Sequence, residues 1–168
     1  MTTTQPCASP DRDAARRMWR EYAAARPGDI SQGEEVVADH FGDSAALADE
    51  LLGLVLAGQK RATATLAAEF HLQGERLPRI GDHWVACDGS GKPQAILRST
   101  ELRLGPPASV DQAFAWDEGE DDRQRSTWLE QHLAYWQRVC AAQGIEWRGD
   151  NEVVFERFRI VWPPDLAN

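Results

Sequence analysis

The sequence has few cysteines and nothing that would tie it to a membrane or to secretion. Its three cysteines, Cys7, Cys87 and Cys140, are scattered, and no two have the spacing of a metal site. No apolar run reaches the length of about 18 residues that a transmembrane helix needs, and the first ten residues lack the apolar centre of a signal peptide. We therefore expect a cytoplasmic protein with free thiols and no membrane partner.

Basic residues are also scarce. The chain has 18 Lys and Arg against 27 Asp and Glu, which gives a formal net charge of −9 and a pI near 4.9. Non-specific binding of duplex nucleic acid needs many cations to displace counterions, so duplex DNA is not an expected partner. The composition favours a small or locally held substrate over a long polyanion.

Several catalytic motifs are missing. The chain has no P-loop, no GxGxxG and no GxSxG, and its four histidines form no HExxH pair. The enzyme classes that these motifs mark therefore lose support.

Hydrophobic patterning predicts an α+β protein. A first helix is expected with Ser9 as its N-cap and Pro10 as its first residue, and apolar residues at i, i+3, i+4 and i+7 give it one buried stripe. A second helix is expected from Asp43-Ser44 to a C-cap at Gly58. The apolar stripe of the first helix consists of Ala15, Met18, Trp19 and Tyr22.

Alternating apolar residues and turn signals predict strands after residue 77. No linker or repeat interrupts the pattern, so we expect one domain over residues 9–168 and a disordered segment over 1–8. The expected elements are strands at 84–87, 95–97, 100–104 and 153–162, a short helix at 110–116 and a long helix at 126–142.

A short segment after the second helix concentrates cations and hydroxyls. A lysine that ends a helix often complements the helix dipole. Here Arg61 adjoins Lys60, and Thr63 and Thr65 follow within one glycine-led segment. Two cations and two hydroxyls are suited to holding a phosphate or polarising a carbonyl.

The segment from Asp111 to Asp122 contains six acidic residues and no basic one. Three interpretations remain open: a solvated surface, a site for a divalent cation such as Mg²⁺ or Mn²⁺, or a glutamate that turns inward to pair with Lys60. Trp116 stands directly before the carboxylates and offers a surface on which a base can stack.

The start of the long helix holds two further candidates. Ser126 is expected to be its N-cap, and the opening backbone amides of the helix would also suit an anion. His132 shares a face with Trp128 and Leu133, which favours a buried, hydrogen-bonded histidine over a general base.

Several motifs, taken in order, resemble the ASCH family over roughly residues 38–162. The residues that carry the resemblance are Phe41-Gly42-Asp43, 48–51, 54–63, 77–82, 117–121, Ser126-Thr127-Trp128 and His132. The resemblance implies a PUA-like mixed or antiparallel β-barrel flanked by helices. Compared with the short members of the family, this chain adds the N-terminal helix and the helix at 126–142.

The resemblance also implies two activities. One is cleavage of single-stranded RNA, and the other is removal of the acetyl group from N4-acetylcytidine-type nucleosides. Lys60 and Thr63 match the family's lysine and threonine, and Glu118 is the best counterpart of its glutamate, with Glu120 in reserve. Additional substrate contacts are expected from Arg61, Thr65, Trp116, Glu120 and Ser126.

Each member of this catalytic trio has two possible roles. Lys60 either stabilises an oxyanion or, with a lowered pKa, acts as a base. Thr63 is either a nucleophile or a hydrogen-bond donor, and Glu118 either holds the lysine or shuttles a proton. None of these roles requires a metal ligand, although a Mg²⁺ or Mn²⁺ cofactor stays open.

The predicted function is that of a hydrolase acting on single-stranded RNA, because the longer architecture offers a wider groove with tryptophans for stacking. The alternatives are an amidohydrolase for modified nucleosides and a non-catalytic module that binds RNA or a nucleotide. The expected partner is therefore single-stranded RNA or a modified nucleoside.

Overall fold

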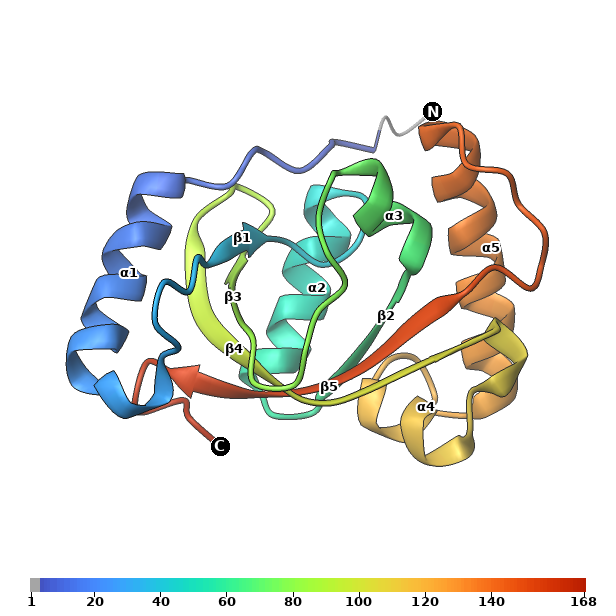
Figure 1. The fold of residues 1–168 in the computed structure, drawn as a ribbon. Helices are drawn as coiled ribbons and strands as arrows, with labels where there is room; N and C mark the ends of the chain where they lie inside the picture. The colour runs from blue at the N-terminus through green and yellow to red at the C-terminus, as the bar shows by residue number, and fades with distance from the viewer. Residues whose placement is uncertain (1–3) are drawn as a thin grey trace. The chain divides into compact units, whose positions relative to one another are not determined.

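The computed structural model describes residues 4–168 (Figure 1). These residues divide into two compact units. The first unit contains the described residues up to Gly58 together with Gly81–Arg98 and Arg159–Asn168, and the second contains Gln59–Ile80 and Ser99–Phe158. The chain thus crosses between the units repeatedly, a division that sequence patterning did not predict.

The first helix of the first unit, α1 (Arg12–Ala25), begins later than predicted. Its N-cap is Asp11, whose carboxylate accepts a hydrogen bond from the backbone N of Ala14 at 2.9 Å, so the prediction of Ser9 as N-cap was wrong. The reason lies in the preceding backbone, since the N–H groups of Ala8 and Asp11 donate to the carbonyls of Gly89 and Gly91. These bonds keep the chain extended up to Asp11. The predicted disordered segment falls partly on residues 1–3, which lie outside the described residues.

The apolar stripe of α1 packs as predicted. Ala15 and Tyr22 are buried, and Met18 and Trp19 are partly buried against the same core cluster. That cluster also takes in Val85 and Cys87 from β3 (His83–Cys87) and Ile96 from β4 (Pro93–Gly105).

The second helix, α2 (Ala45–Leu56), confirms the predicted cap. The Ser44 hydroxyl accepts from the backbone N of Leu47 at 3.3 Å. The buried face of α2 consists of Ala48, Leu51, Leu52 and Val55. The three-residue strand β1 (Val37–Asp39), which pairs parallel with β3, is too short to leave a sequence signal and was not predicted.

The second unit is built on β2 (Ala62–Leu66), which pairs antiparallel with β5 (Val153–Trp162). The strand order is β1-β3-β4-β5-β2, of which β4 and β5 run through both units. The two strands predicted at 95–97 and 100–104 are one continuous strand, β4. A short helix, α3 (Ala67–Leu72), follows β2, and single 3₁₀ turns occupy Pro27–Asp29 and Pro107–Ser109.

Two helices, α4 (Gln112–Glu118) and α5 (Arg125–Gln143), lie next to each other in the second unit (Figure 1). They pack on β2 and β5 around one apolar cluster. Its buried members are Ala62, Leu66, Val110, Phe114, Ala115, Trp128, Trp136, Cys140, Val153 and Phe155.

The prediction of Ser126 as N-cap of the long helix was wrong. Gln124 occupies that position without a capping side chain, and Ser126 is exposed in the first turn. A residue from another segment takes over the capping task, because the side chain of Gln112 accepts from the backbone N of Arg125 at 3.0 Å. Such a cap leaves no local signal in the sequence.

The predicted α+β class, with a mixed sheet and flanking helices, is confirmed. Within residues 4–168, no helix combines the length and the apolar character that a membrane span requires.

Candidate functional site

The segment that carries Lys60 is anchored to the end of α4. The backbone N of Arg61 donates to the carbonyl of Asp117 at 2.7 Å, and the carbonyl of Arg61 accepts from the backbone N of Phe158 at 3.0 Å. The side chain of Gln59 donates to the carbonyl of Gly119 at 2.7 Å. Lys60 therefore enters β2 from a backbone that is fixed on both sides.

Lys60 is a buried cation. Its residue is 2% exposed, and its Nζ lies 2.6 Å from Oε1 of Glu120 and 3.3 Å from Oε1 of Glu118. Burial by itself would lower the pKa of the ammonium, but the carboxylates of Glu120 and Glu118 outweigh burial and raise this pKa above its ordinary value. The raised pKa favours the role of Lys60 as a cation over its alternative role as a base.

Glu118 is the buried centre of the cluster. It is 1% exposed, and its Oε1 lies 3.2 Å from Nε2 of His132, while Trp128 Nε1 donates to Oε2. Burial would raise the pKa of Glu118, but His132 and Lys60 lower it below the ordinary range. Of the three interpretations of the acidic segment, the one in which a glutamate turns inward to Lys60 is confirmed.

The turn after α4 brings the second carboxylate onto the same lysine. Gly119 has a φ of +72°, and a Cβ at this position would lie 2.5 Å from the carbonyl oxygen of Gln59. Glycine is therefore required both for the left-handed conformation and for the close approach. Glu120 emerges from this turn with 21% of its side chain exposed, so it forms the solvent side of the cluster.

His132 and Trp128 hold Glu118 from α5. They are four residues apart on one helix face, with ring centroids 3.9 Å apart and an interplanar angle of 14°. The prediction of a buried, hydrogen-bonded His132 is confirmed. Its link to Glu118 was missed, because the spacing reveals a shared helix face but not the partner that faces it.

Glu118, Glu120 and His132 also offer donor atoms that lie within 4.8 Å of one another. Two carboxylates and an imidazole suit a divalent cation. However, the Lys60 ammonium contacts both carboxylates, so a metal ion would have to displace it. Lys60 thus supplies the positive charge that a metal ion would otherwise bring, and we call Lys60, Glu118, Glu120 and His132 the lysine cluster.

Thr63 belongs to a different group of side chains. Ala62 and Ala64 pack in the core beneath α5, so strand alternation directs Thr63 and Thr65 to the opposite face of β2. Thr63 lies directly opposite Glu156 of β5, where paired side chains share a face.

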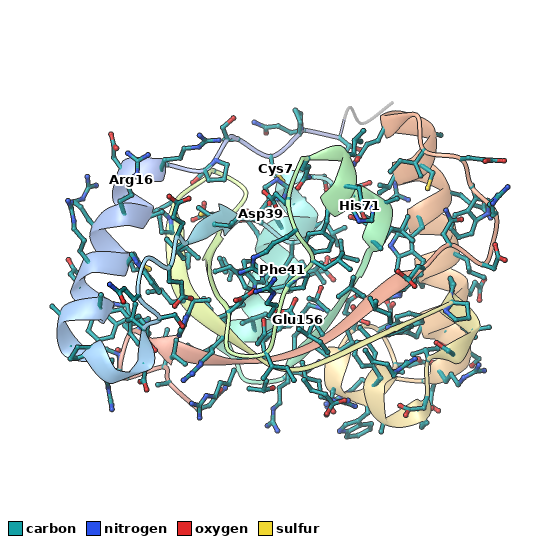
Figure 2. The ribbon with its side chains drawn as sticks, in the orientation of Figure 1. Cys7, Arg16, Asp39, Phe41, His71 and Glu156 are labelled. Carbon is teal, nitrogen blue, oxygen red and sulfur yellow. The ribbon has the colours of Figure 1, made fainter. Side chains whose placement is uncertain are left out.

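Glu156, labelled in Figure 2, is 7% exposed and accepts from the hydroxyl of the buried Ser99 at 2.5 Å. We call Thr63, Ser99 and Glu156 the hydroxyl cluster. The structure therefore brings Lys60 and Glu118 together and places Thr63 opposite Glu156 in the β2–β5 ladder. The catalytic role of Thr63 stays a prediction.

The expected substrate contacts differ in accessibility. Trp116 is 52% exposed, and the guanidinium of Arg123 covers its ring at 3.9 Å from the centroid. Arg61 and Ser126 are exposed, whereas Thr65 is half-buried. Glu120 is in contact with Lys60, but the roles of all five in binding a substrate stay predictions.

Comparison with known proteins assigns the family. The ASCH domain model matches residues 35–162. The structure of an ASCH domain from Lactobacillus crispatus JV V101 is similar, with a TM-score of 0.78 and 29% identity over 89% of this chain and 94% of that one. A protein from Enterococcus faecalis V583, described by the family model DUF984, has a TM-score of 0.77 and 26% identity over 89% of both chains. No curated protein matches the sequence. The chain belongs to the ASCH domain family.

Proposed function

We propose that this chain is a hydrolase of single-stranded RNA in which the Lys60 ammonium stabilises the negative charge that develops during cleavage. ASCH domains are generally regarded as RNA-binding, which supports RNA as the substrate class. The observation that carries the proposal is a fully buried ammonium kept charged by two carboxylates, of which one is partly exposed.

Glu120 is the exchangeable partner of Lys60, that is, the carboxylate that a substrate oxygen can replace. It reaches solvent, whereas Glu118 is enclosed by Trp128 and His132. A phosphate oxygen that replaces Glu120 would meet a cation already stripped of water. Electrostatic stabilisation is strong at such a site, because the cation needs no reorganisation and the surroundings have a low dielectric constant.

In the proposed reaction, the 2′-hydroxyl of the RNA attacks the adjacent phosphorus, and the 5′-oxygen of the next nucleotide leaves as a hydroxyl with the proton that Glu120 took from the 2′-hydroxyl and passes on. A 2′,3′-cyclic phosphate remains, which water then hydrolyses. Lys60 neutralises a non-bridging oxygen of the pentavalent phosphate, and the displaced Glu120 accepts the proton of the 2′-hydroxyl. Trp116, two residues before Glu118, is 52% exposed, and the face of its ring opposite Arg123 supplies a stacking surface for a base. Arg61, also exposed, supplies a second cation for the backbone.

A second candidate is the amidohydrolase of N4-acetylcytidine-type nucleosides. It is favoured by the depth of Lys60, whose side chain is 1% exposed and is better matched to a small carbonyl than to a long strand. In this reaction, water adds to the acetyl carbonyl, and Lys60 stabilises the oxyanion of the tetrahedral intermediate. The carbon–nitrogen bond then breaks to give acetate and cytidine, whose N4 amine takes up a proton lost by the water. The net charge of −9 also suits a neutral nucleoside.

One assay separates these functions from a non-catalytic binding module. Purified protein is incubated with labelled single-stranded RNA and, separately, with N4-acetylcytidine, each with Mn²⁺ or with a chelator. The chain has two lysines, and Lys92 is exposed, so Lys92→Ala is a matched control for Lys60→Ala. RNA fragments that depend on Lys60 but not on Lys92 support the nuclease, and release of cytidine with the same dependence supports the amidohydrolase.

Binding of RNA without turnover of either substrate would replace both enzymes with the binding module. Thr63→Val tests the remaining member of the predicted trio, with Thr100→Val, exposed on β4, as its control. Loss of a catalytic hydroxyl is expected to lower turnover by about a hundredfold or more, whereas the Thr100 variant is expected to keep it.

A further inference from the structure

The two ring nitrogens of His132 both face hydrogen-bond acceptors. Nδ1 lies 2.9 Å from the carbonyl oxygen of Trp128, and Nε2 lies 3.2 Å from Oε1 of Glu118. A neutral imidazole has one N–H and can therefore satisfy one of these acceptors. When Glu118 is ionised, both contacts can be hydrogen bonds only if both ring nitrogens carry a proton, that is, if His132 is an imidazolium.

Charge balance in the lysine cluster points the same way. Glu118 and Glu120 carry two negative charges, and Lys60 alone supplies one positive charge. Since Glu118, Lys60 and His132 are buried, an uncompensated carboxylate among them would be strongly destabilising. The imidazolium of His132 brings the cluster to zero net charge.

The electrostatics of His132 agree with this proton count. Burial would lower the pKa of its imidazolium, but the carboxylate of Glu118, with a smaller contribution from Glu120, raises it above the ordinary value. Lys60 opposes this rise because it carries a like charge. These charged groups come from the segment before β2, from the end of α4 and from the turn that follows α4.

The donors around Glu118 fix its position. Lys60 and His132 share Oε1, and Trp128 donates to Oε2. Without the His132 imidazolium, the negative charge of Glu118 would be balanced by Lys60 alone, and Glu118 would bind the Lys60 ammonium more strongly. The ammonium would then be less available to a substrate oxygen that displaces Glu120.

We propose that His132, in its imidazolium form, is a positioning residue that acts through Glu118 to keep the Lys60 ammonium available to the substrate. This inference rests on the proposed hydrolase function. It adds that turnover falls as the pH rises and His132 loses its proton, while Lys60 is still charged.

The test is the pH profile of kcat and KM for RNA cleavage by the wild type and by His132→Gln. His71→Gln is the matched control, because His71 is exposed on α3. We expect His132→Gln to lower kcat by about tenfold to a hundredfold, the range typical of misplacing a catalytic group, with a smaller change in KM. We also expect its profile to lack the alkaline decline of the wild type, and the control to retain it.

A second variant guards against a folding defect. Trp128→Phe keeps an aromatic ring in the core but removes the donor to Glu118, so it is expected to lower kcat while the alkaline decline persists. Thermal unfolding of each variant identifies proteins that do not fold. NMR of the ring nitrogens provides a readout independent of activity, and doubly protonated His132 is expected at neutral pH.

Three results would overturn the inference. One is an unchanged kcat and pH profile in folded His132→Gln, and another is a neutral imidazole at neutral pH in active wild type. The third is a wild type that cleaves no RNA, which refutes the proposed nuclease itself and is thereby distinguishable from the first two.

Discussion

The second unit contains two buried carboxylates in contrasting surroundings. Glu118, 1% exposed, receives nitrogen donors from Lys60, His132 and Trp128. Glu156, 7% exposed, receives the hydroxyl of Ser99 and lies opposite Thr63 in the β2–β5 ladder. The first carboxylate contacts a lysine and a histidine, whereas the second accepts from a serine hydroxyl.

This contrast divides the predicted chemistry between two places. Lys60, the cation proposed to stabilise negative charge, belongs to the lysine cluster, and Thr63, the predicted nucleophile or donor, belongs to the hydroxyl cluster. A short sequence distance between Lys60 and Thr63 therefore does not mean that they share a carboxylate.

The largest expected effect comes from removing the cation. Lys60→Met leaves the buried Glu118 and the partly buried Glu120 without their shared partner, and breaking a buried pair in this way costs about 3–5 kcal/mol. Urea unfolding measures the loss. Adding Glu118→Gln and Glu120→Gln to Lys60→Met is expected to restore much of it, because both carboxylate charges are gone and His132, without them, loses the cause of its raised pKa and becomes neutral. A single variant as stable as the wild type would contradict the account of the lysine cluster.

A smaller effect is expected in the hydroxyl cluster. Ser99→Ala removes the hydroxyl that donates to the buried Glu156, and a hydrogen bond to a charged group contributes about 1.5–3 kcal/mol. The free energy of unfolding of Ser99→Ala, compared with exposed Ser90→Ala, tests this. If Lys60→Met no longer changed the free energy of unfolding once Ser99→Ala was present, the two clusters would be energetically coupled and would form one unit.

The pH dependence of stability distinguishes the lysine cluster further. The pKa of His132 is raised above 6.5, so the stability that it contributes is fully present below pH 6.5 and is lost as the pH rises through the folded-state pKa. The pKa of Glu118 is lowered below 4.5, so its contribution is present above pH 4.5 and is lost as the pH falls. Unfolding free energies of wild type and His132→Gln should differ most below pH 6.5 and converge at alkaline pH. A difference that is constant with pH would show that His132 does not titrate with folding.

The smallest expected effect is that of Glu120→Gln. Its side chain is 21% exposed, so solvent screens its ion pair, and we expect a loss of less than about 1 kcal/mol. Inorganic phosphate, monitored by calorimetry, is expected to bind this variant more tightly, because its competitor for Lys60 has lost its charge. Weaker phosphate binding would mean that Glu120 is not the exchangeable partner.

Sequence patterning predicted much of the local structure because the signals were local. The stripe of α1, the Ser44 cap and the long helix follow from spacing within one turn or a few turns. Two features depend on distant segments and were not predicted correctly. One is the start of α1, which follows residues bonded to Gly89 and Gly91, and the other is the cap that Gln112 supplies to α5.

The same distinction applies to the candidate site. Lys60 and the acidic segment were visible as opposite charges, which made their pairing predictable. The enclosure of Glu118 by His132 and Trp128 was not, because it depends on the left-handed turn at Gly119 and on how α4 faces α5. The pairing of Ser99 with Glu156, 57 residues apart, likewise arises from strand pairing.

The most direct test of the central claim is the protonation of Lys60 itself. Because the chain has two lysines, ¹⁵N labelling of lysine gives two Nζ signals, which Lys92→Arg assigns. The account predicts that Lys60 keeps its proton to a pH above 10.5, the ordinary lysine value, because Glu118 and Glu120 retain the charge. Loss of that proton well below pH 10.5 would show that burial prevails over the carboxylates, and would make Lys60 a base instead of a fixed cation.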